Sequence, residues 1–362
     1  MRTFLSLNYG SSSLKVGFFV EEEPLLRESH KATHLEEFKK ALINLKAKLK
    51  EKPQFLAHRV VHGMDYKGPM EINKDTLPLL ERLATLNPLH NLIAFHCIKV
   101  SLELFPESKH YALFDTDFHK TLPLHAQLYA LSWDMYHRGI KRYGFHGISY
   151  SYLLERAKEI LKKEGPNLIL MHLGSGCSVC AIKEGISIDT SMGFSPLEGL
   201  PMATRPGDLD PGILLYLLKD YPNPEELEKL LYYNSGIKGL WGRESFEEVV
   251  KAKETDQRAK VVFDLFLHRL LKYVGAYWFL LEGSVDALVF SGGIGENSPQ
   301  VRHSLCEKLR PFGVEIDPRK NQEGDTLLST ENSKVKVLLI RTDEELHMVQ
   351  ILKRVIESPT SS

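Results

Sequence analysis

Two segments far apart in the chain repeat one design, in which an apolar strand, a short polar turn and a second apolar strand follow one another. The first occupies residues 3–20, with its turn at 8–13, and the second occupies residues 168–182, with its turn at 174–176. Glycine and serine turns between β-branched and aromatic residues are typical of β-hairpins. The chain therefore reads as internally duplicated. Because 362 residues exceed what one hydrophobic core usually spans, we expect two domains.

The segments between and after the hairpins show helical and strand patterns in turn. Helical periodicity appears at residues 35–51, 76–104, 150–163, 210–232, 257–281, 298–309 and 343–357. Short apolar strand candidates occupy residues 55–61, 111–114, 287–290 and 335–340. Strands that alternate with helices predict an α/β fold. We expect an N-terminal domain at 1–150 and a C-terminal, nucleotide-binding domain at 151–362, with the C-terminal helix able to pack back on the first domain.

Charge and composition exclude several classes of partner. A net charge of -1 provides no global attraction to nucleic acid or to an anionic membrane, so local groups must hold any bound anion. The opening residues MRTFLSLNYG reach a polar turn too early for a signal peptide, and no segment approaches the roughly 20 apolar residues that cross a bilayer. The 4 cysteines are too sparse for a disulfide framework. We expect a cytoplasmic protein without nucleic-acid or membrane partners.

Three glycine-rich turns at strand ends are candidate phosphate sites. The first, residues 8–15, places Ser11, Ser13 and Lys15 where hydroxyls, an ammonium group and backbone N–H groups can converge on phosphate oxygens. An ordinary glycine/serine hairpin is an equally good interpretation of this turn taken alone. Taken singly, the turns at 172–176 and 292–297 are equally weak evidence for a phosphate site. Together, the three turns favour a nucleotide site formed by two domains.

Nine segments in order along the chain resemble the signatures of the acetate kinase family. They are LNYGSSSLK, HRVVHG, NPLHN, FDTDFH, YGFHG, HLGSG, TSMGFSPLEGLPMATRPGDLDP, SGGIGENS and TDEEL. The resemblance covers nearly the whole chain. It implies the duplicated, two-domain actin-like (ribonuclease H-like) α/β fold of the acetate and sugar kinase/Hsp70/actin superfamily, with a central cleft, and a homodimer.

Four positions match the family's catalytic residues. Arg59 and Arg205 match its two active-site arginines, whose planar guanidinium groups can hold a carboxylate and the oxygens of a transferring phosphoryl group. His146 matches the histidine that stabilises the transition state, and Asp115 matches the acid/base position, where we expect an ionised carboxylate that holds an arginine. The structural alternatives are a surface ion pair for the arginines, a packing histidine and a strand-capping aspartate.

The resemblance also implies a metal site and a pocket for the acid substrate. Asn8 and Glu344 match the family's Mg²⁺ ligands, and Mn²⁺ is expected to be able to replace Mg²⁺; a hard cation held by few oxygen groups plus phosphate suits this pair. The residues that match the pocket for the acid are Arg59, Val61, Leu89, His90, Phe145 and Pro196. Elsewhere in a protein, the apolar members of this set would be ordinary core residues.

The implied nucleotide site is the part where the sequence departs most from the family. Besides Ser11, Ser13 and Lys15, the matching positions are His172, Leu173, Gly174, Ser175, Gly176, Gly293, Ile294, Gly295, Glu296 and Asn297. Where the family has an Asp-x-Arg that contacts the base, this chain has Ser245, Phe246 and Glu247. Further departures occur at Tyr9, Met64, Asp117, Ile148, Tyr150 and Ser175.

The activity that the resemblance implies is reversible phosphoryl transfer from ATP to acetate, which gives acetyl phosphate and ADP. A propionate or butyrate kinase of the same family is the alternative within enzymes. A non-catalytic nucleotide-binding regulatory protein is the alternative of another class. Arg59, Asp115, His146 and Arg205 together argue against that alternative, because nucleotide binding alone would not require all four.

Overall fold

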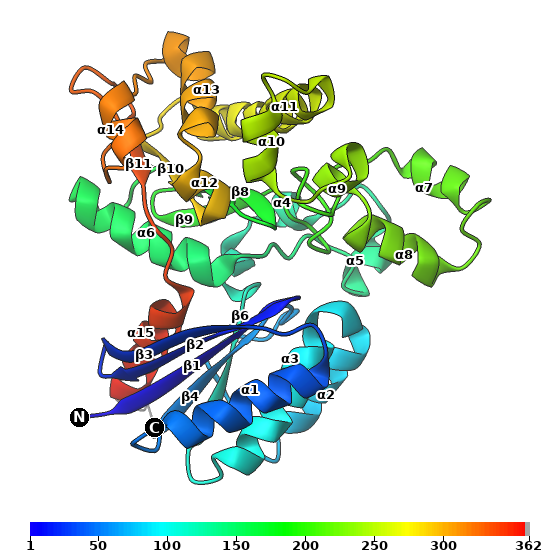
Figure 1. Cartoon of the computed structure of the whole chain (residues 1–362), viewed down its shortest axis with the longest axis vertical. Coiled ribbons are helices and arrows are strands. Elements are labelled where there is room, and N and C mark those ends of the chain that lie inside the picture. Colours follow the sequence, from blue (N-terminus) through cyan, green and yellow to red (C-terminus); the bar gives the residue numbers. More distant parts are fainter. Residues whose placement is uncertain (359–362) are drawn as a thin grey trace. The chain divides into compact units, whose positions relative to one another are not determined.

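The computed structural model describes residues 1–358 and divides into two compact units (Figure 1). Unit 1 comprises residues 1–120, 147–152 and 343 onward, and unit 2 comprises residues 121–146 and 153–342. The expected boundary at residue 150 lies inside helix α6 (Gly147–Leu161), whose first residues group with unit 1. The C-terminal helix α15 (Glu344–Glu357) groups with unit 1 as well. Residues 359–362 lie outside the described part of the chain.

Unit 1 contains a six-stranded mixed sheet of order β3-β2-β1-β4-β6-β5. Its strands are β1 (Thr3–Tyr9), β2 (Ser13–Val20), β3 (Glu23–Lys31), β4 (Phe55–Val60), β5 (Met70–Glu71) and β6 (Lys109–Phe114). The first three strands form an antiparallel meander, and β1, β4 and β6 run parallel to one another. Parallel neighbours bring the carboxyl ends of β1, β4 and β6 to one edge of the sheet.

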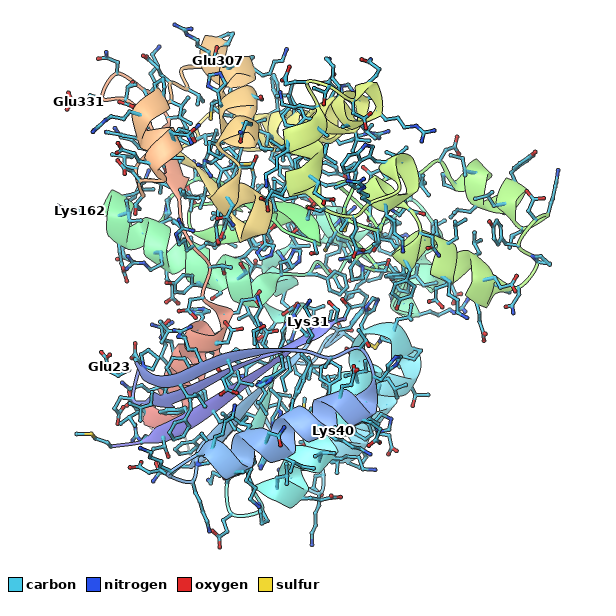
Figure 2. All side chains as sticks on the ribbon, in the orientation of Figure 1. Glu23, Lys31, Lys40, Lys162, Glu307 and Glu331 are labelled. Atoms are coloured by element: carbon cyan, nitrogen blue, oxygen red, sulfur yellow. The ribbon has the colours of Figure 1, made fainter. Side chains whose placement is uncertain are left out.

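Helices cover both faces of the unit 1 sheet. They are α1 (Leu35–Lys48), α2 (Leu77–Leu86), α3 (Pro88–Leu104) and α15, and the short 3-10 helix η1 (Asp117–Thr121) follows β6. One core cluster joins one sheet face to α1 and α3, and another joins the opposite face to α15. Helix α1 is amphipathic, since it buries Phe38 and Leu42 and directs Lys40 to the outside (Figure 2).

Unit 2 repeats the strand topology of unit 1, with a five-stranded sheet of order β11-β10-β7-β8-β9. Its strands are β7 (Leu168–Leu173), β8 (Cys177–Lys183), β9 (Ile186–Thr190), β10 (Ala287–Ser291) and β11 (Lys336–Leu339). Strands β7, β8 and β9 form the antiparallel meander, and β10 and β11 add in parallel beside β7. The predicted duplication is therefore confirmed at the level of strand order.

The other elements of unit 2 are helical, and the long helix α11 packs against β7 and β8. They are α4 (Leu124–Gln127), α5 (Trp133–His137), most of α6, α7 (Pro211–Leu217), α8 (Pro224–Tyr233), α9 (Gly236–Trp241), α10 (Phe246–Ala252), α11 (Gln257–Leu280), α12 (Gly292–Asn297), α13 (Pro299–Leu309), η2 (Arg310–Phe312) and α14 (Pro318–Glu323). Among the described residues, no helix combines the length and the apolar character that a membrane span requires.

Two predicted helices are each divided in the structure, and the edge strands β3, β5 and β9 were not predicted. The segment 76–104 breaks before Pro88, and 210–232 breaks before Pro224, because proline fits the first turn of a helix but not its interior. The edge strand β3 buries almost none of its side chains, and β9 is short, so neither gives a clear apolar alternation.

Candidate functional site

A first cluster of polar residues forms where three parallel strands of unit 1 end. Asn8 is on β1, Arg59 is on β4 and Asp115 directly follows β6. Side chains alternate between the two faces of a strand, so each of these residues points to the face that carries α15. Three residues distant in sequence therefore converge through strand pairing and alternation alone.

Arg59 is the centre of this cluster. Its Nη2 donates to Asp115 Oδ2 at 2.6 Å, and its Nε donates to both carboxylate oxygens at 3.1 and 3.2 Å. Its Nη1 donates to Asn8 Oδ1 at 3.0 Å. The Asp115 side chain is 1% exposed and that of Arg59 is 14% exposed. Burial raises the pKa of Asp115, and the charge of Arg59 acts against this rise. A carboxylate that is buried in this way fixes the guanidinium rather than contacting solvent.

The start of helix α15 adds two carboxylates to this cluster. The Asn8 side-chain amide donates to Glu344 Oε2 at 2.8 Å and to Glu345 Oε1 at 3.0 Å. Burial, together with the neighbouring charge of Glu344, raises the pKa of Glu345, and Lys15 opposes this rise. Two adjacent carboxylates would be stabilised by a cation, and hard oxygen donors are what Mg²⁺ prefers. The described residues contain no ready-made group of three acidic, histidine or cysteine ligands. These residues therefore fit a Mg²⁺ ion that also uses phosphate oxygens.

A second cluster forms in unit 2 around His146, which begins α6 in a left-handed conformation with φ of 58°. Its Nδ1 lies 2.7 Å from the Ser178 hydroxyl, and its ring stacks on His172 with centroids 4.2 Å apart. His172 and Ser178 are directly paired across β7 and β8, so their side chains share one face. The hairpin that the sequence predicts to bind phosphate therefore holds the imidazole in place.

Arg205 and His146 meet above Gly176, in the turn between β7 and β8. A Cβ atom at Gly176 would lie 2.7 Å from Arg205 Nη2 and 3.3 Å from His146 Nε2. The Pro196 carbonyl accepts a hydrogen bond from Arg205 Nη1 at 3.0 Å. Within residues 1–358, no carboxylate lies at ion-pair distance from Arg205, and burial lowers the pKa of its guanidinium. A partly buried cation without a counter-ion is a strong candidate for binding an anion.

The second and third glycine turns lie together in unit 2. A Cβ at Gly292, which has φ of +76°, would lie only 2.6 Å from the backbone oxygen of Leu173. Helix α12 begins here, where the sequence suggested a turn. Glu296 Oε1 accepts from Gly292 N–H at 3.3 Å and from Thr342 N–H at 2.9 Å, so it fastens the local backbone. Ser175 and Gly293 are exposed beside this junction.

The residues expected at the nucleotide base have structural roles in unit 2. Ser245 caps α10 by accepting from the Glu248 N–H at 3.3 Å. Phe246 is buried against Phe266, with ring centroids 4.6 Å apart, so its ring has no face open to a base. Glu247 is exposed and pairs with Lys251. The role of these residues in nucleotide binding stays a prediction, and their packing lends it no support.

The residues expected around the acid substrate are divided between the units. In unit 1, Asn91 brings two of their segments together: it accepts from His62 N–H at 3.0 Å and donates to the His62 carbonyl at 2.7 Å. Val61 precedes His62, and Leu89 and His90 precede Asn91. In unit 2, Phe145 and Pro196 are buried beside the cluster of His146 and Arg205.

Two features of the site were not predicted from the sequence: the part that Glu345 plays in the polar cluster, and the environment of Tyr9. Glu345 could have been found, because a Glu-Glu pair opens the last predicted helix. The alternation of β1 turns Tyr9 away from Asn8, and its hydroxyl lies 2.9 Å from His58 Nδ1 in the core. His58 Nε2 lies 3.0 Å from His110 Nδ1 in turn. The side chain of Tyr9, which departs from the family pattern, therefore lies on the opposite face of the sheet from the polar cluster and is not part of it.

Comparisons with known proteins identify the family of this chain. A sequence model of the acetokinase family matches residues 18–350. The acetate kinase of Sulfurimonas denitrificans is 45% identical over 298 residues, which cover 81% of this chain and 76% of that protein. A propionate kinase from Francisella tularensis has a TM-score of 0.90 at 34% identity, covering 97% of this chain and 98% of that one. An acetate kinase from Porphyromonas gingivalis has a TM-score of 0.88 at 31% identity, covering 99% and 100%. With matches of this extent in sequence and structure, the chain belongs to the acetokinase family.

Proposed function

We propose that this enzyme reversibly transfers the γ-phosphoryl group of ATP to acetate, giving acetyl phosphate and ADP. The observation that carries the proposal is the convergence of Arg205 and His146 on the backbone of Gly176, with no carboxylate of the described residues near enough to pair with the guanidinium. Phosphoryl transfer requires such positive groups, because negative charge spreads over the equatorial oxygens in the transition state. A regulatory protein that only bound nucleotide would gain little from this arrangement.

The chemistry is a direct in-line displacement at phosphorus. A carboxylate oxygen of acetate forms a bond to the γ-phosphorus while the bond to the β–γ bridging oxygen breaks, and ADP leaves with that electron pair. Arg205 donates to the equatorial oxygens and His146 offsets their developing charge. Arg59 binds the acid, and Asp115 positions Arg59. Asp115 and Asn8 already engage most of the N–H groups of Arg59, so we assign the larger share of transition-state stabilisation to Arg205.

We further propose that Mg²⁺ arrives with the nucleotide and is held by Glu344 and Asn8, with Glu345 beside them, and that Mn²⁺ can replace it. When bound, the metal neutralises phosphate charge. Asn8 then fixes the two carboxylates through its amide, and Lys15, which faces Asn8 across the hairpin, provides a further positive charge. We also propose a cytoplasmic homodimer, in keeping with exposed apolar side chains on α7 such as Leu215 and Tyr216.

A hydroxamate assay tests the activity directly. The purified protein is incubated with ATP, Mg²⁺, hydroxylamine and acetate, propionate or butyrate, and acyl hydroxamate is measured. Acetyl hydroxamate should form and should require both ATP and acetate. If a folded protein forms no acyl hydroxamate with any of the three acids, the proposed function is wrong.

We expect acetate to be preferred over butyrate, and we expect Val61→Ala to shift kcat/KM towards propionate. Val61 is branched and directly precedes the segment that Asn91 fixes, so it should narrow the pocket beyond the methyl group of the acid. Each methylene that fits or clashes changes the free energy of the transition state by about 1 to 3 kcal/mol. The ratios of kcat/KM for the three acids are the measurement.

Leu92→Ala is the control for this prediction, since Leu92 is 42% exposed on α3 and should leave the ratios unchanged. Equal kcat/KM values of the parent enzyme for butyrate and acetate would contradict the assignment of Val61 to the pocket.

We expect the enzyme to discriminate only weakly between phosphoryl donors. The chain lacks the Asp-x-Arg at 245–247, and hydrogen bonds to a base are what separates ATP from GTP and ITP. We expect kcat/KM for these three donors to agree within about tenfold. The double variant Ser245→Asp with Glu247→Arg restores the pattern while keeping a residue that can cap α10, and it should raise the preference for ATP. A hundredfold preference for ATP in the parent enzyme would show that other residues discriminate the base.

A further inference from the structure

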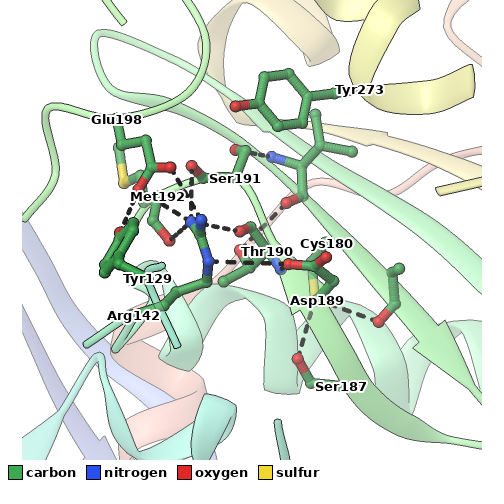
Figure 3. Close-up of polar contacts among 12 residues, drawn as sticks. Tyr129, Arg142, Cys180, Ser187, Asp189, Thr190, Ser191, Met192, Glu198 and Tyr273 are labelled. Carbon is green, nitrogen blue, oxygen red and sulfur yellow. Dashed lines mark hydrogen bonds and ion pairs between the residues drawn. The ribbon is translucent and has the colours of Figure 1, made fainter. Parts of the chain in front are cut away.

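Arg142, four residues before His146, lies at the centre of a hydrogen-bond network that none of the sequence motifs indicates (Figure 3). Its Nη1 donates to the carbonyl groups of Thr190, Ser191 and Met192 at 3.2, 3.4 and 3.2 Å. Its two Nη groups donate to the two carboxylate oxygens of Glu198 at 3.1 and 2.9 Å. The side chain of Arg142 is 16% exposed. Only a planar guanidinium can reach this set of acceptors at once.

Tyr129 completes the environment of Glu198. Its hydroxyl donates to Glu198 Oε2 and accepts from the N–H of Phe194 at 2.9 Å, while its ring lies 5.3 Å from the Arg142 guanidinium. The space is filled so closely that a Cβ atom at Gly193 would overlap both Glu198 and the Tyr129 hydroxyl. Arg142, Glu198 and Tyr129 together therefore hold one defined backbone path for residues 190–198.

The same segment continues to Arg205, and a second group of hydrogen bonds holds residues 199–208 in place. Asp208 Oδ1 accepts from Gly199 N–H at 2.8 Å, and Asp208 Oδ2 accepts from the Tyr273 hydroxyl at 2.6 Å. Gly207 has φ of +73°, and a Cβ there would overlap the backbone of Gly199 and Leu200. Residues 199–208 thus form a closed loop that carries Arg205, and residues 190–198, which Arg142 holds, lead into it.

The backbone beyond Arg142 is tied to the same loop. The N–H groups of Tyr143 and Gly144 lie 3.1 and 3.3 Å from the Gly193 carbonyl, to which both donate. His146 follows directly. In addition, Pro196, whose carbonyl binds Arg205, lies between Gly193 and Glu198 along the chain. The guanidinium of Arg142 therefore connects the segment of His146 to the segment of Arg205.

We propose that Arg142 is a positioning residue of the phosphoryl-transfer reaction, which sets the places of Arg205 and His146 through Glu198 and the backbone of 190–198. The proposal rests on the proposed function of the enzyme. It has a second electrostatic consequence: because Glu198 is bound to Arg142 and Tyr129, it does not pair with Arg205 in the same loop, and Arg205 keeps its charge available for a phosphoryl group.

Arg142→Lys tests the proposal, because it keeps the charge and loses the paired and branching hydrogen bonds. A displacement of about 1 Å at the reacting centre can reduce the rate by about a hundredfold, so we expect kcat to fall roughly 10- to 100-fold. The KM for ATP should change only a few-fold. Arg138→Lys is the matched control, since Arg138 is exposed in the same segment and its guanidinium donates to Met135 Sδ at 3.6 Å. A folded Arg142→Lys enzyme with the kcat of the parent would overturn the proposal.

A double-mutant cycle separates positioning from a general loss of stability. If Arg142 acts through Arg205, then Arg142→Lys should lower kcat much less in an Arg205→Ala background than in the parent enzyme. Multiplicative effects would overturn the proposal. Tyr129→Phe provides a milder variant that removes only one hydroxyl, and we expect its kcat to fall about fivefold with the same non-additivity. Melting curves of each variant confirm that it is folded. A parent enzyme without any acyl hydroxamate would instead contradict the proposed function itself.

Discussion

Replacement of Arg205 by alanine should lower kcat at least about a hundredfold while the KM for ATP stays within a few-fold of the parent value. The guanidinium of Arg205 makes one hydrogen bond, to the Pro196 carbonyl, and has no carboxylate partner among residues 1–358. Its remaining N–H groups can therefore serve a ligand. Such a group stabilises most strongly the negative charge that develops only in the transition state. The substitution should therefore lower kcat more than it weakens the binding of ATP.

Comparison with Arg302 shows why Arg205 is assigned to chemistry and not to folding. Arg302 is also buried without a carboxylate partner in the described part of the chain, but its Nε and Nη2 donate to the side chain and the carbonyl of Asn321 at 2.7 and 2.8 Å. Its Nη1 donates to the Gly295 and Glu296 carbonyls at 2.8 and 3.0 Å. A structural arginine thus has its donors satisfied by the protein, and Arg205 does not.

Steady-state kinetics with acetate and ATP, together with melting temperatures, check the Arg205 prediction. Arg243→Ala is the matched control, because the Arg243 side chain is 67% exposed in the same unit and its loss should leave kcat unchanged. Arg205→Lys should recover only part of the activity, since an ammonium group cannot donate in the planar, paired geometry of a guanidinium. Turnover near that of the parent enzyme in a folded Arg205→Ala variant would remove Arg205 from the proposed mechanism.

The convergence of Asn8, Arg59 and Asp115 could be predicted from the sequence because it depends on regular structure. Each residue lies near the end of a strand whose apolar pattern is readable, and period-two alternation puts them on one face. The family resemblance predicts a chemical role for each of these residues. It also predicts catalytic roles for Arg205 and His146, although neither lies in a strand, and all of these roles stay predictions.

The network of Arg142 could not be predicted in the same way. Its partners Thr190, Ser191, Met192 and Glu198 are reached through a loop whose path depends on Gly193, Gly199 and Gly207. The path of such a loop has no sequence periodicity. Arg142 also binds backbone carbonyl groups, and since every residue has one, the residue types in the loop do not indicate these contacts. The environment of Phe246 was missed for a related reason, since its burial depends on the helices α10 and α11 packing together.

Asp115→Asn should both lower kcat by at least about a hundredfold and destabilise the enzyme by roughly 3 kcal/mol. The substitution keeps the shape of the side chain, but it removes the carboxylate charge that is hydrogen-bonded to the buried Arg59 guanidinium. Loss of one member of a buried ion pair costs more than the pair itself contributes, because the remaining charge stays desolvated. Arg59 would then be drawn towards Glu344 and Glu345, which Asn8 holds nearby.

Asp117→Asn is the matched control for Asp115→Asn. Asp117 lies two residues further along and pairs with Lys120 at 3.1 Å, and both side chains are partly exposed. A pair of this kind contributes about 1 kcal/mol or less to the free energy of unfolding, so stability and kcat should change little. Equal losses in the two variants would show that the ion pair between Asp115 and Arg59 has no special role.

The pH dependence of kcat/KM gives an independent test of Asp115. Burial raises the pKa of Asp115 above its ordinary value of about 4, although Arg59 acts in the opposite direction, so this carboxylate accepts a proton earlier than an exposed aspartate as the pH falls. Protonation removes the negative charge that holds Arg59, and kcat/KM should therefore decrease towards acidic pH on a limb above that ordinary value. Asparagine cannot titrate, so the limb should be absent from the remaining activity of Asp115→Asn. An unchanged limb in that variant would assign the titration to Glu345, whose pKa is also raised by burial, and would contradict the role proposed for Asp115.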